Sequence, residues 1–390
     1  MYSGDYHYGR QTITDEDVKA VMEVMTSDYI TQGPKSIEME KVLGKYFGAS
    51  NAMVVSNGTV SLHLIGRALG WKEGDVILTV PTTFLSSANC ALFCGATPDF
   101  VDIDAKTYTM DPAALEEKVL QYRAKGRNVK AIVAVDFAGN PCNWDALKQL
   151  ADKYEFQLVN DNCHALGAEY HGDKQYAVKY ADMINLSFHP VKHITTGEGG
   201  AVLTNDSVSD AFMKRLRIHG VTKDVSLMEK CDGPWDYEMI DLGYNYRITD
   251  FQCALGISQM KRLDSFVAKR REIAKFYDEA LGKDDRFIIP EMQKNGTHAY
   301  HLYPLQIKFD QLDLTKKEVF ARFQEKKLFC QVHYIPVHLQ PYYRKRFGYK
   351  QGDFPVAEQF YKNEISIPMY PALNEEDLIY IVDTIKNIVY

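Results

Sequence analysis

Lys192 and Asp161 are the two residues whose type and setting most strongly suggest covalent chemistry. Lys192 ends the run SFHPVK after a predicted strand, and the flexible run ITTGEGG follows at residues 194–200. A partly desolvated lysine loses its proton more easily, and its free amine condenses with an aldehyde or ketone to form an imine. Asp161 ends a second predicted strand, at the strand end where ligands of open α/β sheets normally bind. Either residue alone has a simpler explanation, as a surface charge or a helix cap, so the interpretation depends on the pair.

Together the two residues suggest a site for pyridoxal phosphate. In enzymes that use this cofactor, a carboxylate holds the pyridine nitrogen protonated, and the ring then acts as an electron sink. Asp161 can play that part, and His164 lies three residues further on, where it can bond the phenolic oxygen of the ring. An isolated histidine is more often a satisfied polar group, so this assignment depends on the neighbouring motifs.

A phosphate site is predicted at the run SNGT, because this run precedes a helical pattern over residues 60–69. Gly58 and Thr59 can present backbone N–H groups and a hydroxyl at the helix N-terminus, where an anion is favoured. Ser187 can add a second hydroxyl to the same anion. Phe84 follows another strand and can lie against an aromatic ring, although a place in the core is nearly as common for such a residue.

A largely parallel, buried sheet is expected to position these residues. Short apolar runs alternate with helical patterns between about residues 50 and 205, which is typical of an α/β fold. We predict strands over residues 76–80, 98–103, 131–135, 157–159, 184–188 and 201–203.

The second half of the chain is expected to form a smaller α+β domain. A long helix with a charged face is predicted from residue 266 to 281. Strands are predicted at 300–309 and 328–333, and helices at 316–326 and 375–389. We therefore divide the chain into a large cofactor-binding α/β domain, residues 1–265, and a small C-terminal domain, residues 266–390.

An N-terminal helix is predicted to begin at Thr14, with Asp17 three residues further on as the second half of a capping box. Four apolar residues recur at helical spacing and make one face of this helix: Val18, Val21, Met22 and Met25.

Composition excludes several classes of function. The 45 Lys and Arg residues against 52 Asp and Glu give a net charge of −7, which disfavours nucleic acid as the main partner. The first ten residues lack the apolar stretch of a secretory signal, and no run of 18 apolar residues occurs, so we expect a cytoplasmic protein that does not bind membranes. No Cys/His cluster has the spacing of a metal site, and none is predicted.

Five motifs in the same order resemble the nucleotide-sugar aminotransferases of the DegT/DnrJ/StrS family. They are SNGT, PTTF, the run NDNCHALGAEY, SFHPVK with ITTGEGG, and GYNYRITDFQCALG. The likeness runs from YGRQ at residues 8–11 to IPMYP at residues 367–371, which is nearly the whole chain. The resemblance implies a fold-type I pyridoxal phosphate enzyme.

The resemblance also implies roles for particular residues. Lys192 would carry the cofactor, Asp161 would pair with the pyridine nitrogen and His164 would face the phenolic oxygen. Phe84 would stack on the ring, and Gly58, Thr59 and Ser187 would hold the phosphate. Asn245 would reach the phosphate of a neighbouring subunit, so that a homodimer would share its active sites. Residues expected near the substrate are Tyr8, Gly33, Arg247, His333, Tyr334 and His338, of which the last three can equally pack as parts of a strand.

The reaction that the resemblance implies has two halves: L-glutamate gives up its amino group, and a nucleotide-linked 4-ketosugar accepts it. The runs YGRQ, DYITQGP and QVHYIPVH most resemble members that act in pseudaminic acid biosynthesis. We therefore expect a UDP-linked 4-keto-6-deoxy-N-acetyl-hexosamine as substrate and UDP-4-amino-4,6-dideoxy-N-acetyl-β-L-altrosamine as product. Another nucleotide-4-ketosugar aminotransferase, such as GDP-perosamine synthase, shares these blocks and remains an alternative.

Three other functions remain to be weighed. A nicotinamide-dependent oxidoreductase is disfavoured because no GxGxxG follows a first strand. A binding module without turnover is disfavoured because Lys192 and Asp161 are both present. A sugar dehydratase of the same fold carries histidine in place of the lysine, and here the Pro190-Val191 dipeptide places Lys192, not His193, at that position.

Overall fold

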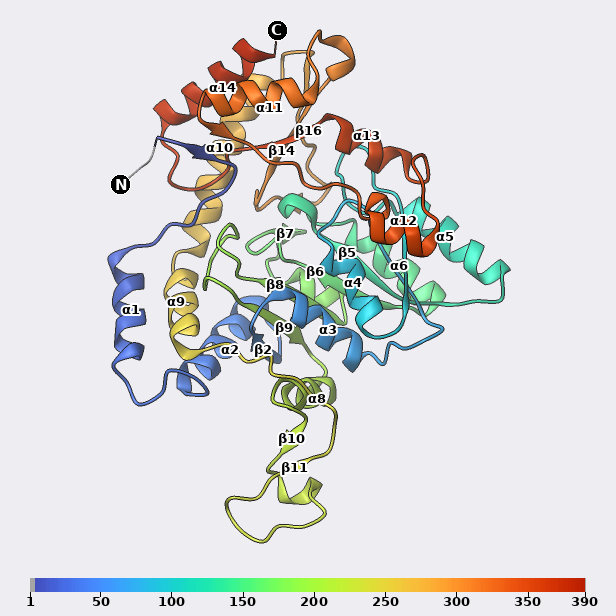
Figure 1. Cartoon of the computed structure of the whole chain (residues 1–390), viewed down its shortest axis with the longest axis vertical. Coiled ribbons are helices and arrows are strands. Elements are labelled where there is room, and N and C mark those ends of the chain that lie inside the picture. Colours follow the sequence, from blue (N-terminus) through green and yellow to red (C-terminus); the bar gives the residue numbers. More distant parts are fainter. Residues whose placement is uncertain (1–3, 390) are drawn as a thin grey trace.

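The central sheet lies among helices in the larger part of the chain (Figure 1), and six of its seven strands run in one direction. The computed structural model describes residues 4–389. The sheet order is β2 (Asn51–Val55), β9 (Gly200–Thr204), β8 (Met183–Ser187), β6 (Gln157–Asp161), β5 (Val129–Val135), β3 (Val76–Thr79) and β4 (Thr97–Phe100). Strand β9 pairs antiparallel with both neighbours, and the other pairs are parallel. Six strands therefore end at the same edge, and the expected mainly parallel α/β fold is confirmed.

Both faces of this sheet are covered by helices, which explains why its strands are apolar on both sides. On β5, Ala131 and Val133 pack into one core, while Ile132 and Ala134 pack into another. The first core includes α3 (Gly58–Ala68), α4 (Ser86–Phe93) and α8 (Ser207–Arg217). The second includes α2 (Pro34–Phe47), α5 (Pro112–Ala124), α6 (Trp144–Tyr154) and α7 (Tyr176–Tyr180). The six predicted strands are confirmed, with ends that differ by a few residues.

The predicted N-terminal helix is α1 (Asp15–Met25), and it packs on α9 (Asp250–Met260). Thr14 is its N-cap, and the Thr14 backbone N–H donates to the Asp17 carboxylate at 2.9 Å. The predicted apolar face is not covered by the rest of this chain, since Val18 and Met22 are 52% and 56% exposed.

Asp17 anchors this helix through an ion pair with the half-buried Arg262, and Gln259 adds a hydrogen bond at 2.8 Å. Asp17 is fully buried, so removing its cation leaves a carboxylate that is only partly compensated. We expect Arg262→Ala to lower the free energy of unfolding by about 3 kcal/mol in urea denaturation. Lys148→Ala, which breaks an exposed pair with Asp152, is the control and should cost less than about 0.5 kcal/mol. Equal costs for the two variants would contradict this account of α1.

The C-terminal part has its own hydrophobic core around a three-stranded antiparallel sheet. Its strands lie in the order β12 (Phe287–Ile288), β14 (Tyr303–Ile307) and β16 (Glu364–Ile367), and its helices are α10 (Leu263–Leu281), α11 (Lys316–Glu325) and α14 (Glu375–Ile388). The predicted helices are confirmed here. The helices α12 (Pro341–Phe347) and α13 (Pro355–Asn363) instead pack against the larger core, through residues such as Tyr343 and Phe360. The domain division at residue 265 stays a prediction.

The predicted strand over residues 328–333 forms only in part. Strand β15 (Leu328–Phe329) pairs in parallel with β1 (Tyr6–His7), and Gln331 makes an isolated antiparallel bridge with Ser366. Further along, the His333 backbone N–H donates to the Glu364 carboxylate at 2.9 Å instead of to a neighbouring strand. A side chain has thus replaced the backbone partner that a strand would need.

Two smaller antiparallel pairings complete the fold. The strands β7 (Glu169–Tyr170) and β13 (Gly296–Thr297) link the two halves of the chain. The strands β10 (Val221–Thr222) and β11 (Glu238–Met239) form an arm that projects from the body below α8 (Figure 1). Within residues 4–389, no helix is long and apolar enough to cross a membrane.

Candidate active site

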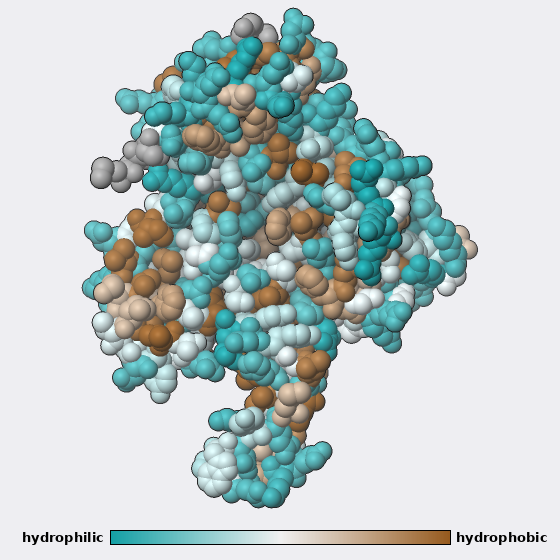
Figure 2. Space-filling model, viewed as in Figure 1, coloured by the Kyte–Doolittle hydropathy of each residue, from teal (hydrophilic) through white to brown (hydrophobic). Residues whose placement is uncertain are grey.

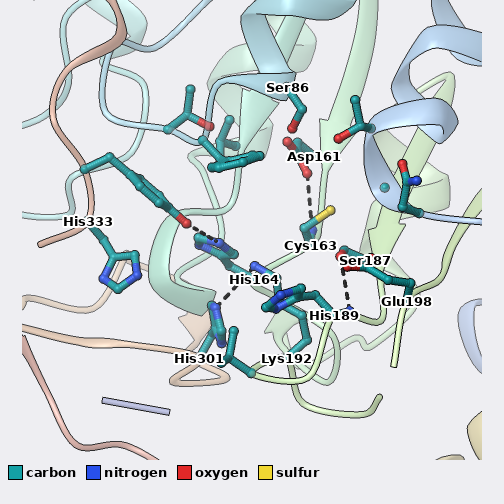
Figure 3. A pocket seen from close by; sticks show the side chains of 18 of the residues that line it. Ser86, Asp161, Cys163, His164, Ser187, His189, Lys192, Glu198, His301 and His333 are labelled. Atoms are coloured by element: carbon teal, nitrogen blue, oxygen red, sulfur yellow. Dashed lines mark hydrogen bonds between the residues drawn. The ribbon is translucent and has the colours of Figure 1, made fainter. Parts of the chain in front are cut away.

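A pocket of about 680 Å³ opens at the carboxyl ends of the sheet strands (Figure 3). It brings together ten of the residues singled out from the sequence, which come from the N-terminal segment, the sheet edge and the C-terminal part. These ten are Tyr8, Gly58, Thr59, Phe84, Asp161, His164, Ser187, Lys192, His333 and Tyr334.

Four other predicted residues do not line this pocket. The backbone N–H of Gly33 donates to the Asp250 carboxylate at 2.8 Å, where Gly33 caps α2. His338 is fully buried, with its Nε2 atom 3.0 Å from Glu358. Arg247 is half-buried, and Asn245 is exposed in the loop that precedes α9. Asn245 does not line this pocket, so its expected contact with the phosphate of a neighbouring subunit stays a prediction.

Lys192 lies in a turn after β8, where its backbone N–H donates to the carbonyl of His189 at 2.9 Å. Its Nζ atom points into the pocket and lies 3.3 Å from Nε2 of His301. Burial lowers the pKa of Lys192 from its ordinary 10.5 to about 8, although nearby Cys163 and Asp161 act to raise this pKa. A neutral amine, which is the nucleophilic form, is therefore accessible near neutral pH.

This lowered pKa predicts the pH dependence of cofactor loading. At pH 7.5 roughly a quarter of the Lys192 amines would be neutral, against about one in a thousand for an ordinary lysine. Because only the neutral amine attacks a carbonyl, we expect the rate at which apoprotein takes up pyridoxal phosphate to rise through pH 8 and level off above about pH 9. Stopped-flow absorbance measures this rate, with Lys192→Ala as the blank. A rate still climbing beyond pH 10 would contradict the depressed pKa.

Asp161 is held in place by three hydrogen-bond donors. The Ser87 hydroxyl donates to Oδ2 at 2.6 Å, the Asn185 amide donates to Oδ1 at 3.0 Å, and the Cys163 backbone N–H lies 3.4 Å from Oδ1. Only 5% of Asp161 is exposed, and that part lies in the pocket. These three donors fix the orientation of a buried carboxylate that lines the pocket, where it can bind a cation or a protonated nitrogen.

His164 has both ring nitrogens occupied. Nδ1 accepts a hydrogen bond from the Ala138 backbone N–H at 3.3 Å, so the neutral ring carries its proton on Nε2. That proton points to the hydroxyl of Tyr334, 3.2 Å away (Figure 3). Burial, with a smaller effect of nearby Lys192, holds the pKa of His164 well below its usual range. His164 is thus a neutral ring that orients Tyr334, and the Tyr334 proton remains available to the pocket.

The N-terminus of α3 forms an anion cradle beside these groups. Its N-cap, Asn57, accepts from the Val60 N–H at 3.0 Å, and the earlier N–H groups of Gly58 and Thr59 have no partner within the helix. A Cβ atom on Gly58 would lie 3.1 Å from Cβ of Ser187 and 3.3 Å from the carbonyl oxygen of Leu186. Only glycine fits there without displacing its neighbours. Backbone N–H groups, the macrodipole and the Thr59 and Ser187 hydroxyls together suit a phosphate.

The sequence reasoning missed His301, which lines the pocket, and two residues that hold Asp161 from behind it, Ser87 and Asn185. His301 lies 109 residues from Lys192 in sequence, and no local pattern connects the two. Ser87 likewise reaches Asp161 only through the packing of α4 against the sheet. Asn185 left a usable signal, because it lies two residues before Ser187 on the same strand and so shares its face.

Comparison with known proteins identifies the family. Residues 11–386 match the DegT/DnrJ/EryC1/StrS aminotransferase family. Over 383 residues the chain is 38% identical to the UDP-4-amino-4,6-dideoxy-N-acetyl-β-L-altrosamine transaminase of Campylobacter jejuni, covering 98% of this chain and 96% of that protein.

Solved structures agree with this assignment. Helicobacter pylori PseC, described as an aminotransferase involved in the biosynthesis of pseudoaminic acid, matches with a TM-score of 0.90 and 32% identity over 99% of both chains. The protein Spr1654 of Streptococcus pneumoniae, solved in a PLP form, matches with a TM-score of 0.88 and 27% identity over 98% of both chains. The chain belongs to the DegT/DnrJ/EryC1/StrS family of aminotransferases, which depend on pyridoxal phosphate.

Proposed function

We propose that this chain transfers the amino group of L-glutamate to C4 of a UDP-linked 4-keto-6-deoxy-N-acetyl-hexosamine, giving UDP-4-amino-4,6-dideoxy-N-acetyl-β-L-altrosamine. The observation that carries the choice of sugar is the similarity to the Campylobacter and Helicobacter proteins over nearly the whole of each chain. The observation that carries the reaction type is that Lys192 and Asp161 line one pocket.

The residues of the pocket fit pyridoxal phosphate. Gly58, Thr59 and Ser187 form a cradle for its phosphate, and the buried Asp161 carboxylate provides a partner for a protonated ring nitrogen. Phe84 is 54% exposed and lines the pocket, which leaves one face of its ring free for an aromatic contact. When bound, the cofactor supplies an electron sink for the pair of electrons left when a proton leaves the carbon beside the amine.

Lys192 is the residue that we assign to proton transfer. Its lowered pKa allows Nζ to take a proton from the α-carbon of glutamate in one half-reaction and to deliver a proton to C4 of the sugar in the other. The neutral His301 ring, 3.3 Å from Nζ, holds the amine in place between these two events. Because the two substrates use the same pocket in turn, ping-pong kinetics are expected.

A second copy of this chain is part of the proposal. Hydrophobic side chains gather on the surface over α1 in Figure 2, and Val18, Met22 and Met25 are each more than half exposed there. Apolar surface of this kind is typical of a protein interface. We infer a homodimer in which Asn245 of each subunit completes the phosphate site of the other.

A panel of ketosugars tests the proposed substrate. Purified protein loaded with pyridoxal phosphate is incubated with glutamate and with UDP-, GDP- and dTDP-linked 4-ketosugars, and the products are identified by mass spectrometry and NMR. We expect amination of the UDP-linked N-acetyl sugar and an equal amount of 2-oxoglutarate. Turnover of GDP-linked sugars alone would overturn the assignment, and a deoxygenated sugar formed without loss of glutamate would show a dehydratase.

A further inference from the structure

His333 enters the pocket at the end of a buried chain of hydrogen bonds. Its Nδ1 atom lies 2.9 Å from Oγ of Ser366, and this hydroxyl donates to Oε1 of Glu364 at 2.5 Å. The second oxygen of Glu364 accepts the backbone N–H of His333 at 2.9 Å. Glu364 and Ser366 are fully buried on β16, and they lie behind the pocket wall that His333 forms.

The direction of this chain follows from the chemistry of its members. An ionised carboxylate can only accept hydrogen bonds, so Ser366 must give its single proton to Glu364. The Ser366 oxygen is then left as an acceptor, and His333 must donate to it from Nδ1. We propose that Glu364, acting through Ser366, fixes His333 in the tautomer protonated at Nδ1, so that its unprotonated Nε2 accepts a hydrogen bond from a hydroxyl or amide N–H of the bound sugar.

Nε2 of His333 is suited to that contact. It has no hydrogen-bond partner among the residues that the structure describes, while the ring lines the pocket. Burial, together with the charge of Lys192, lowers the pKa of His333 to about 3, so the ring stays neutral at working pH. In Figure 3 His333 lies on the opposite side of the pocket from Ser187, away from the phosphate cradle. The identity of the ligand as a sugar rests on the proposed function, whereas the tautomer does not.

The direction of donation along this chain of hydrogen bonds should reverse when Glu364 takes up a proton. Burial raises the pKa of Glu364 to about 7, although Ser366, Lys316 and the His333 N–H favour its charged form. Below that pH the carboxylic acid would donate to Ser366, Ser366 would donate to Nδ1, and the proton of His333 would move to Nε2. Five titratable groups interact electrostatically or by a hydrogen bond with Glu364: Lys316, Cys330, Tyr108, Tyr334 and His333.

Nitrogen NMR of the full-length protein tests the tautomer directly. In protein labelled with ¹⁵N-histidine, the His333 signals are identified by their loss in His333→Gln. At pH 8 we expect a protonated Nδ1 and an unprotonated Nε2, with conversion to the other tautomer as the pH falls below 7. Ser366→Ala removes the acceptor and should give a mixture of tautomers at pH 8, and Glu364→Gln should do the same. A protonated Nε2 at pH 8 in the unchanged protein, or no response to Ser366→Ala, would overturn the proposal.

Kinetics test the role of this tautomer in sugar recognition. For Ser366→Ala we expect the KM for the ketosugar to rise about tenfold, with kcat/KM for glutamate within about twofold of the unchanged enzyme. Glu358→Gln, which alters the His338 pair outside the pocket, is the matched control and should change neither value. Equal losses for both substrates would show a merely structural role and overturn the proposal. If no ketosugar reacts at all, the proposed function fails while the NMR result still decides the tautomer.

Discussion

Replacing Lys192 with alanine is expected to lower kcat for the complete amino transfer by at least about 10⁴-fold, because Lys192 is the one lysine among the described residues that line the pocket. Lys192→Arg is expected to be equally inactive, since a guanidinium keeps the charge but does not give up its proton near neutral pH. Formation of the amino sugar under saturating glutamate measures both. The arginine variant separates the loss of a base from the loss of a positive charge.

Lys179→Ala is the matched control for these variants. Lys179 pairs with Asp173 on the surface, where its side chain is 61% exposed, and it should be replaced with no more than a twofold change in kcat. Activity of Lys192→Ala within a hundredfold of the unchanged enzyme would mean that another group moves the proton.

Asp161→Asn should lower kcat by about 10³-fold with little change in the amount of folded protein. Asparagine has nearly the same shape but carries no charge, so it can no longer hold a ring nitrogen protonated. The absorbance spectrum of bound cofactor provides a second measurement, because loss of the protonated ring changes the spectrum even where turnover is too slow to follow.

Two further variants calibrate this result. Ser87→Ala removes one of the donors to Asp161 but leaves the carboxylate, so a loss of about tenfold is expected. Asp152→Asn, on the exposed face of α6, should leave kcat unchanged. An Asp161→Asn enzyme as active as Ser87→Ala would contradict the assigned role of the charge.

Six of the seven strands of the central sheet were predicted from sequence, because burial on both faces makes them continuous apolar runs, and β2 was missed. The prediction of strands was weakest where the hydrogen-bond partner of a backbone group lies far away in sequence, because no local sequence pattern specifies it. The reversal of β9 depends on its pairing with β2 and β8. Strand pairing ends after Gln331 because the Glu364 carboxylate accepts the His333 N–H. The apolar face of α1 was recognised, but its exposure in the single chain could not be read from its periodicity.

The residues of the site divide in the same way. Lys192, Asp161 and the SNGT run lie directly after strands or at a helix start, so the common edge of the sheet implies that they meet. His301 contacts Lys192 across 109 residues of sequence, and Glu364 acts on His333 from behind the pocket wall. Only the folded chain brings these atoms together. His338 was grouped with His333 because the two share one run, yet the turn between them sends His338 into the core beside Glu358.

The claim on which all of this depends is a covalent link between Nζ of Lys192 and the carbonyl carbon of pyridoxal phosphate. Borohydride reduction of the loaded protein makes such a link permanent, and mass spectrometry of a proteolytic digest then locates it. We predict a single pyridoxyl group on the peptide that contains Lys192. A label on another lysine, or a protein that binds the cofactor and remains unlabelled after reduction, would contradict the account.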